Sequence, residues 1–225
     1  MPLTRRIKSF NSRYPYIGPV FWMLSIQYYL VQLAVANAWI VVPYSWLKNT
    51  ISDLGNTVCG PYAGRFVCSP QHEHMNVSFV VLGITMIVGS TLVYHEFRRS
   101  TETAIGFSFM ALAGFGTALV GLFPENSAHA LHALGASLPF LIGNMGLVIL
   151  GLVLDMPRSL RIYTVVSGVI SLAAFSLFFI HAYPGIGQGG MERVAAYPQT
   201  IWLIVFGIYI SRSHYRHERK SVVKV

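Results

Sequence analysis

The stretch Met75–Tyr94, MNVSFVVLGITMIVGSTLVY, carries no charged residue. A helix of about 20 apolar residues crosses the hydrocarbon core of a bilayer. The apolar residues run continuously instead of alternating with period two, which favours a helix over a barrel strand. Six such segments occur: Tyr16–Val42, Met75–Tyr94, Ala104–Phe123, Leu131–Leu154, Ile162–Ala182 and Pro198–Ser211, the last with a possible earlier start near Val194. The sequence therefore predicts an all-α membrane protein, with residues 1–225 forming one bundle of six transmembrane helices.

Positive charge is concentrated on one side of this pattern. Of the 16 Lys and Arg, the cytoplasmic side of the expected topology receives Arg5, Arg6, Lys8, Arg13, Arg98, Arg99, Arg158, Arg161, Arg212, Arg216, Arg219, Lys220 and Lys224, and the other side receives Lys48, Arg65 and Arg193. The positive-inside rule then predicts a cell-membrane protein with both termini in the cytoplasm and basic tails at 1–15 and 212–225. The first apolar segment is too long for a signal-peptide core, so we expect it to remain as an anchor. Anionic lipids, and not nucleic acid, are the expected partners of the net charge of +8.

The outer connection between the first two segments, residues 43–74, is longer than most loops and is expected to have a function or a structure of its own. It contains CGPYAGRFVC, from Cys59 to Cys68. Its Gly and Pro residues permit a tight turn, and an outer compartment is oxidising. We therefore predict a disulfide between Cys59 and Cys68, with two free buried thiols as the alternative.

The same connection contains Ile51-Ser52-Asp53-Leu54-Gly55. A carboxylate beside the membrane is costly unless it is hydrogen-bonded or paired. Ser52 or Asp53 either caps a short helix or turn, for which such residues are suited, or belongs to a functional site. The pattern alone leaves both interpretations open.

His129 and His132 open the fourth segment in HALH, and their spacing places both imidazoles on one helix face. Two histidines and a carboxylate could bind zinc and leave a position for water. The HALH pattern is weak as a zinc motif, and a structural or headgroup-facing role is more common. No haem is expected, because the histidines lie at one level instead of stacking across the membrane.

GGMERVAAYP, residues 189–198, precedes the sixth segment and contains Glu192 and Arg193. An arginine fork suits a carboxylate or a phosphate of a ligand. The alternative is an internal ion pair of Arg193 with Asp53 or Glu125. Because lipid offers no polar partners, we expect these side chains to gather in one outer cluster with Arg193 at its centre. Its candidate catalytic residues are Asp53, His129, His132 and Glu192, and its candidate ligand-binding residues are Arg193, Ser52 and Glu125.

Five motifs together resemble the DUF998 family, a prokaryotic integral-membrane family of unknown function. They are ISDLG (51–55), NVSF (76–79), GLFPEN (121–126), HALHALGA (129–136) and GGMERVAAYP (189–198). The resemblance extends from about Tyr16 to Arg212. Ser-Asp-x-Gly after the first helix is also similar, more distantly, to the DRAM-type six-helix membrane proteins. The resemblance implies six helices with motifs on the outer side, and it implies no established reaction.

Three function classes remain open. An outward-facing site that binds or acts on a lipid or lipid-linked group fits the acid–base residue types of the cluster. A non-catalytic accessory or structural protein could use the same cluster to hold a lipid headgroup or a protein partner. A transporter or channel is disfavoured, because the apolar segments lack ionisable residues at mid-depth and show no inverted repeat.

Overall fold

The computed structural model describes residues 13–222, with side chains described as far as residue 216. Within this part of the chain, six helical segments are long and apolar enough to cross a membrane. They are Ile17–Asn37, His72–Glu96, Thr101–Leu122, His129–Val153, Arg158–Phe179 and Gly187–Arg216. The chain is a multi-pass membrane protein, and the predicted all-α bundle of six spans is confirmed.

Several spans consist of more than one helix. In chain order the helices are α2 (Ile17–Met23), α3 (Ile26–Asn37), α4 (His72–Val93), α5 (Thr101–Leu122), α6 (His129–Ser137), α7 (Asn144–Val153), α8 (Arg158–Phe179) and α9 (Gly187–Val222). Short 3₁₀ helices occupy Ser52–Gly55 (η1) and Tyr94–Glu96 (η2), and a π-helical turn, η3, occupies Leu138–Gly143 between α6 and α7. The first span is therefore α2 plus α3, and the fourth is α6, η3 and α7.

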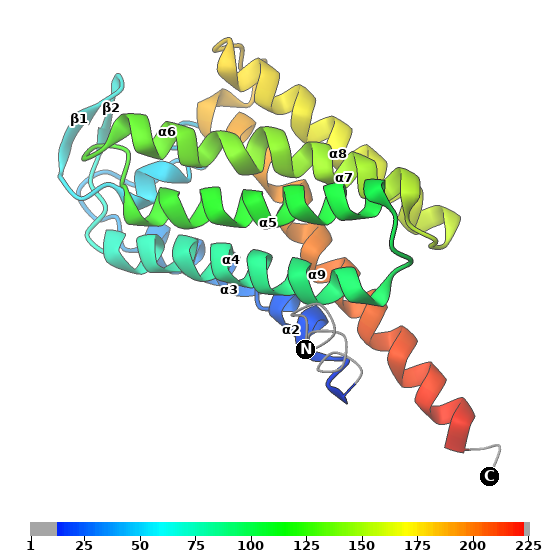
Figure 1. Ribbon diagram of the computed structural model, residues 1–225. Helices are drawn as coiled ribbons and strands as arrows, with labels where there is room; N and C mark the ends of the chain where they lie inside the picture. Colours follow the sequence, from blue (N-terminus) through cyan, green and yellow to red (C-terminus); the bar gives the residue numbers. More distant parts are fainter. Residues whose placement is uncertain (1–12, 223–225) are drawn as a thin grey trace.

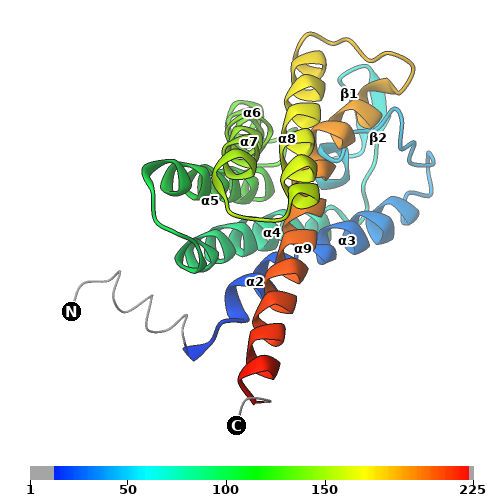
Figure 2. The same ribbon diagram turned by 90° about the vertical axis from the view of Figure 1, so that its right-hand side faces the viewer.

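The spans form a closed ring of contacts in which each span packs against its neighbours in sequence. In Figure 1, α4, α5 and the span of α6 and α7 lie side by side. α4 lies along α5, α5 along α6 and α7, α7 along α8, and α8 along α9. α9 also packs against α2, and this contact closes the ring between the last and first spans (Figure 2). Because successive spans run in opposite directions, the connections that precede α4, α6 and α9 all lie at the end of the bundle opposite residue 13.

Glycines allow the closest approaches between helices. A Cβ atom added to Gly83 would lie 2.4 Å from the carbonyl oxygen of Gly114, where α4 crosses α5. A Cβ on Gly116 would lie 2.4 Å from the carbonyl oxygen of Gly135, where α5 meets α6. Small residues of this kind let membrane helices pack backbone to backbone.

Two prolines interrupt helical hydrogen bonding in the halves of the fourth and sixth spans that lie nearer the connections before α6 and α9. Pro139 lies in η3, where the fourth span changes to π-helical geometry. Pro198 lies inside α9 and has no N–H for the carbonyl of Val194, four residues earlier. The Ser171 hydroxyl on α8 donates to that carbonyl at 3.4 Å. Neighbouring helices satisfy freed backbone groups in this way within a membrane bundle.

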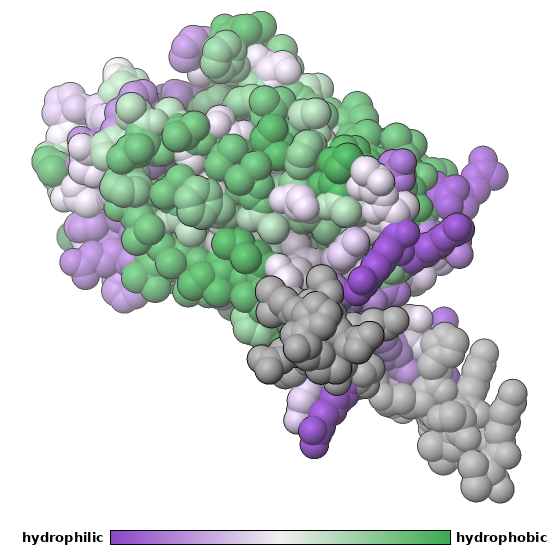
Figure 3. Space-filling view, in the orientation of Figure 1, coloured by the Kyte–Doolittle hydropathy of each residue, from purple (hydrophilic) through white to green (hydrophobic). Residues whose placement is uncertain are grey.

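Apolar side chains cover most of the bundle face shown in Figure 3, and polar residues lie toward its two ends. Leu30, Phe115 and Leu152 are 59%, 52% and 65% exposed, as side chains that face lipid are expected to be. The core contains an aromatic group in which the fully buried Trp22 packs against Phe107 and Trp202.

The long connection before α4 has structure of its own. It contains η1 and an antiparallel hairpin of β1 (Gly60–Tyr62) and β2 (Arg65–Val67). Cys59 and Cys68 form a disulfide at the base of this hairpin, with Cα atoms 4.1 Å apart. The predicted disulfide is present in the structure.

The boundaries of the first and sixth spans differ most from the prediction. The first helix was expected to reach Val42, but it ends at Asn37. Pro43 disfavours helical geometry at Val42, and beyond Asn37 the buried Trp39 packs against Tyr44. The sixth helix was expected near Pro198 or Val194, but it begins at Gly187. Glu192 and Arg193 therefore lie on the second turn of α9 instead of in a loop.

The predicted basic tails fall largely outside the described part of the chain. Arg5, Arg6, Lys8 and Lys224 lie outside the described residues, and the side chains of Arg219 and Lys220 are not described. The start of the predicted C-terminal tail, from Arg212, is the end of α9.

Candidate functional site

The site is built on η1, which follows a turn of short polar residues. The carboxylate of Asp53 accepts hydrogen bonds from the Thr50 N–H and from Asn49 Nδ2, each at 3.0 Å. The Asp53 N–H donates in return to Thr50 Oγ1 at 3.1 Å. These reciprocal bonds hold the turn that leads into η1. The N-cap residue of η1 is Ile51, without a side-chain cap, so Asp53 stabilises this turn and does not cap the helix.

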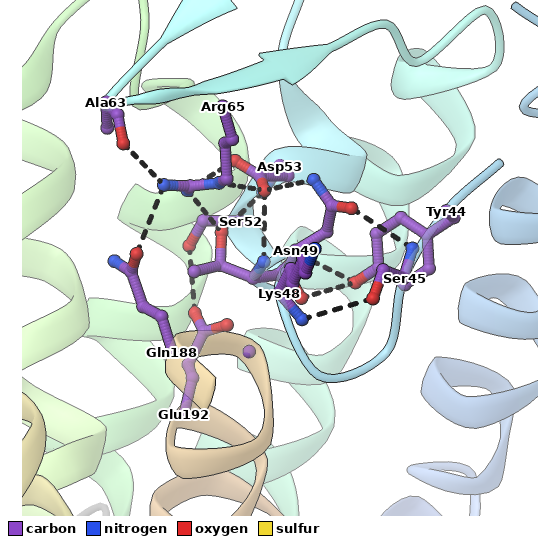
Figure 4. Close-up of polar contacts among 12 residues, drawn as sticks. Tyr44, Ser45, Lys48, Asn49, Ser52, Asp53, Ala63, Arg65, Gln188 and Glu192 are labelled. Atoms are coloured by element: carbon purple, nitrogen blue, oxygen red, sulfur yellow. Dashed lines mark hydrogen bonds and ion pairs between the residues drawn. The ribbon is translucent and has the colours of Figure 1, made fainter. Parts of the chain in front are cut away.

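The β-hairpin brings Arg65 onto the same carboxylate (Figure 4). Arg65 Nε and Nη2 donate to Asp53 Oδ2 and Oδ1, each at 2.6 Å. The guanidinium also donates to Thr50 Oγ1 at 3.2 Å and, from Nη1, to Gln188 Oε1 on α9 at 3.2 Å. Arg65 thus connects η1, the hairpin and the start of the sixth span.

Ser52 lies beside Asp53 but points to different partners. Its Oγ lies 3.0 Å from His132 Nε2 on α6 and 3.2 Å from Glu192 Oε1 on α9. The other oxygen of Glu192 accepts a hydrogen bond from the Ile51 N–H. One hydroxyl therefore joins side chains from the fourth and sixth spans.

The second ring nitrogen of His132 fixes the orientation of the imidazole. His132 Nδ1 lies 2.9 Å from the carbonyl oxygen of Phe123, in the connection between α5 and α6. A carbonyl only accepts hydrogen bonds, so Nδ1 carries the proton. In the neutral ring, Nε2 then presents its lone pair to the Ser52 hydroxyl.

Glu125, in the same connection, is a buried acid without a cation of its own. It is 9% exposed, and its Oε1 has no hydrogen-bond partner in the structure. Burial, followed by the negative charges of Asp53 and Glu192, raises the pKa of Glu125 to about 9. The carboxyl group is therefore protonated at neutral pH and is able to donate a hydrogen bond.

A cavity of about 430 Å³ opens in front of these groups. Its polar wall includes Ser52, Tyr62, Arg65, Glu125, His129 and His132. Its apolar wall includes Phe140 from η3 and Phe175, Phe178 and Phe179 from α8. An apolar lining with a few convergent polar groups is typical of small-molecule sites.

The structure brings most of the predicted site residues together. Asp53, Ser52, His132 and Glu192 are connected by hydrogen bonds through η1, and Glu125 and His129 line the same cavity. His129 Nδ1 lies 3.4 Å from the Tyr62 hydroxyl, which also donates to the Glu125 carbonyl at 3.0 Å.

Arg193 is not at the centre of the cluster, and the alternative of an ion pair with Asp53 or Glu125 is not formed either. Arg193 Nη1 donates to the carbonyl oxygens of Trp46, Asn49 and Gly189 at 2.8–2.9 Å. Its guanidinium also bonds to the Tyr44 hydroxyl and lies over the Trp46 ring, 4.8 Å from the centroid. Arg193 is therefore committed to the segment before η1, because that segment folds across the start of α9.

The histidines do not assemble the zinc ligand set considered from the sequence. Both nitrogens of His132 face other groups, Phe123 and Ser52. Among the residues that the structure describes, no three His, Cys, Asp or Glu side chains are grouped to hold a metal ion. The donor set present suits proton transfer and hydrogen bonding.

Sequence reasoning did not select Arg65 or the aromatic wall. Arg65 was considered only for membrane orientation, although it lies between the two cysteines of a predicted closed loop. Arg65 reaches Asp53 only because the hairpin folds back over η1, and the spacing of these residues in the sequence does not reveal that fold. Phe175, Phe178 and Phe179 look like ordinary lipid-facing residues in an apolar segment.

Residues 25–209 match the family model described as protein of unknown function (DUF998). The match covers most of the chain, so the protein belongs to this family, as the sequence motifs indicated. Comparison with curated proteins and with solved structures finds no significant match.

Proposed function

We propose that this DUF998 protein binds, or acts on, a lipid or a lipid-linked group in the cavity between α6 and α8. The observation that carries the proposal is the division of the cavity into two walls. Phenylalanines line one wall, and hydroxyl, imidazole, guanidinium and carboxyl groups line the other. A lipid has the same division between its acyl chain and its headgroup.

The apolar wall lies where a lipid would enter from the membrane. Phe179, which ends α8, is 74% exposed and also lines the cavity. Within this wall, the rings of Phe140 and Phe175 pack against each other, with centroids 5.6 Å apart. Aromatic rings near the end of a span suit the boundary between acyl chains and headgroups.

The polar wall offers several donors to a headgroup. Tyr62 on the hairpin lies next to His129 on α6, and protonated Glu125 has a carboxyl oxygen, Oε1, without a hydrogen-bond partner. The Arg65 charge is largely satisfied by Asp53, so it contributes little net attraction for an anion. The wall is therefore suited to a polar or weakly charged headgroup.

The proposal places the cavity on the outer side of the cell membrane, with both termini in the cytoplasm. The distribution of the 16 Lys and Arg supports this orientation, because only Lys48, Arg65 and Arg193 fall on the cavity side. The disulfide is on the same side and persists best in an oxidising compartment.

Photocrosslinking tests the proposal directly. The full-length protein is reconstituted in nanodiscs with phosphatidylethanolamine that carries a diazirine on its headgroup, and crosslinked peptides are mapped by mass spectrometry. We expect crosslinks at Tyr62, Glu125 and His129, which are remote in sequence but share the cavity. Crosslinks confined to the lipid-facing surface of the spans would contradict lipid binding in the cavity.

Two variants of neighbouring residues provide the control. Ala133→Trp places a large side chain in the cavity, which Ala133 lines. Leu134→Trp changes the next residue, which is 56% exposed and does not line the cavity. Cavity crosslinks should be lost in the first variant and retained in the second. Equal crosslinking in both would instead favour the accessory role, in which the cluster serves a protein partner.

A further inference from the structure

We propose that Ser52 and His132 form a nucleophile–base pair that cleaves an acyl ester of the lipid held in the cavity. This proposal rests on the proposed function and assigns a reaction to the same site. It rests on four observations: the Ser52–His132 contact, the orientation of the imidazole, the access of Ser52 to the cavity, and the unpartnered carboxyl oxygen of Glu125.

The contact between the two side chains has the geometry of nucleophile activation. Ser52 Oγ and His132 Nε2 are 3.0 Å apart, within the range in which a base accepts the proton of an attacking hydroxyl. The two residues are 80 positions apart in sequence and come from η1 and α6. Only the tertiary fold creates this pair.

A third group orients the base. The Phe123 carbonyl accepts the Nδ1–H of His132 at 2.9 Å and leaves Nε2 free to accept a proton. In serine hydrolases an acceptor at this position holds the imidazole in the correct tautomer and stabilises its cationic form. A backbone carbonyl performs the orienting part of that role here.

Ser52 is accessible to a bound acyl group. It is half-buried, lines the cavity and lies on the first residue of η1. The carboxyl of Glu192 accepts a hydrogen bond from the same hydroxyl at 3.2 Å, so the Ser52 proton turns from Glu192 to His132 Nε2 when the base takes it. The Ser52 side chain lines the space where an ester would lie.

Glu125 supplies the polar group that a developing oxyanion requires. Its Oε1 is buried, without a partner, in a residue that lines the same cavity as Ser52. A neutral carboxylic acid donates one hydrogen bond, which Glu125 shares with Asp53 in the resting site and would turn to the oxyanion. Donors directed at an oxyanion stabilise the transition state of acyl transfer.

The reaction consumes water and conserves every proton. Ser52 Oγ bonds to the ester carbonyl carbon while its proton passes to His132 Nε2, and the carbonyl oxygen becomes an oxyanion. The oxyanion re-forms the carbonyl, the bond to the alcohol oxygen breaks, and the departing alcohol takes the proton from His132. Water then attacks the acyl-Ser52 ester, gives a proton to His132, and releases a carboxylic acid as Ser52 regains its hydrogen.

A fluorophosphonate probe tests the nucleophile in the full-length protein. We expect covalent labelling of Ser52, its reduction to background in Ser52→Ala and His132→Asn, and its retention in Ser137→Ala and His74→Asn. The Ser137 hydroxyl donates to the Leu134 carbonyl instead of joining the pair, and His74 is exposed on the first turn of α4, outside the cavity. Labelling that is absent, or that is unchanged in Ser52→Ala, would overturn the proposal.

A cysteine at the same position gives a second test that does not depend on Ser52→Ala being folded. The sequence has two cysteines, and both are in the disulfide, so Ser52→Cys introduces a single free thiol. An imidazole next to a thiol promotes the thiolate, so we expect iodoacetamide to alkylate Ser52→Cys about tenfold faster than Ser137→Cys. Adding His132→Asn should remove this difference, and equal rates in the first two variants would contradict the pairing.

The lipid crosslinks separate this proposal from the proposed function. Crosslinking at Tyr62 and Glu125 in Ser52→Ala, together with no probe labelling of the unmodified protein, would mean that the cavity binds lipid without cleaving it. Loss of both crosslinking and labelling in Ala133→Trp, with both retained in Leu134→Trp, would support the two proposals together.

Discussion

Arg65 binds both carboxylate oxygens of Asp53, at 2.6 Å each, and this pair fastens the disulfide-closed hairpin to the base of η1. The Asp53 side chain is fully buried, and that of Arg65 is 13% exposed. Asp53 also accepts a hydrogen bond from the Thr50 N–H just before η1, whose first residue, Ser52, lies beside His132. The Arg65–Asp53 pair therefore supports the position of Ser52, the candidate nucleophile, without being hydrogen-bonded to its side chain.

Arg65→Met should lower the stability of the protein strongly. Removing one partner of a buried ion pair leaves the other charge uncompensated and costs about 3–5 kcal/mol. A lower melting temperature of the detergent-purified protein, measured by differential scanning fluorimetry, would show this loss. Arg98→Met, at an exposed position on the opposite end, should leave the melting temperature nearly unchanged.

Asp53→Asn should cost less in the Arg65→Met background than in the unmodified protein. The stability losses caused by substituting two residues in direct contact do not add, since the first substitution already removes their interaction. Fully additive losses would show that the two side chains act independently.

Arg193→Lys should destabilise the segment before η1 even though it keeps the charge. A lysine amine is a point charge with three donors, whereas the guanidinium serves three carbonyls, the Tyr44 hydroxyl and the Trp46 ring together. Each buried carbonyl left without a donor costs about 1–3 kcal/mol. Thermal unfolding should show a clear loss, with exposed Arg212→Lys as the unaffected control.

The sequence was sufficient for the bundle because each span is an independent physical signal. Met75–Tyr94 predicts a helix by length and polarity alone, and α4 covers nearly the same residues. The paired cysteines were visible for the same reason, since the turn residues between them are local. Helix ends were harder, because the N–H groups of Gly189 and Gly190 at the start of α9 bond to the carbonyl of Leu47, which is remote in sequence.

The residue types of the site were predictable, but most of their pairings were not. Ser52, Asp53, Glu125, His132 and Glu192 stood out as polar groups beside apolar segments, and they do share one region. Sequence reasoning placed Arg193 at the centre of the cluster, whereas in the structure Arg65 is the arginine that pairs with Asp53. Both arginines fit an acidic partner chemically, and only the path of the hairpin decides between them.

Gly83→Val should disrupt packing between α4 and α5. Even the first added carbon would lie 2.4 Å from the Gly114 carbonyl oxygen, so the helices must separate. The expected result is a smaller monodisperse peak in size-exclusion chromatography and a lower melting temperature. Ile84→Val, at a neighbouring position that is 48% exposed, is the matched control and should behave like the unmodified protein.

Reporter fusions should place both termini in the cytoplasm. An alkaline phosphatase fused after Val225 should be inactive, and green fluorescent protein at the same position should be fluorescent, because the basic residues favour the inner side. A reporter inserted at Gly64, in the tip between β1 and β2, should give the reverse pattern. An active phosphatase at Val225 would contradict the predicted orientation and would mean that the cavity faces the cytoplasm.

Glu125 should make the protein less stable as the pH rises. Burial, and then the charge of Asp53, raises the pKa of Glu125 from 4.5 to about 9. The folded state thus holds a proton that the unfolded state releases, so the contribution of Glu125 is complete below pH 4.5, declines above it and is lost beyond pH 9. Glu125→Gln keeps a neutral side chain at every pH and removes this dependence.

The melting temperature of the unmodified protein, measured from pH 6 to pH 9, should therefore fall relative to that of Glu125→Gln. Glu73→Gln, at an exposed position on the first turn of α4, should follow the unmodified protein over the same range. If the curves of the unmodified protein and Glu125→Gln stay parallel, Glu125 is ionised in the folded state. A carboxylate at that position would repel an oxyanion beside Ser52, so the same titration also tests whether Glu125 can assist ester cleavage.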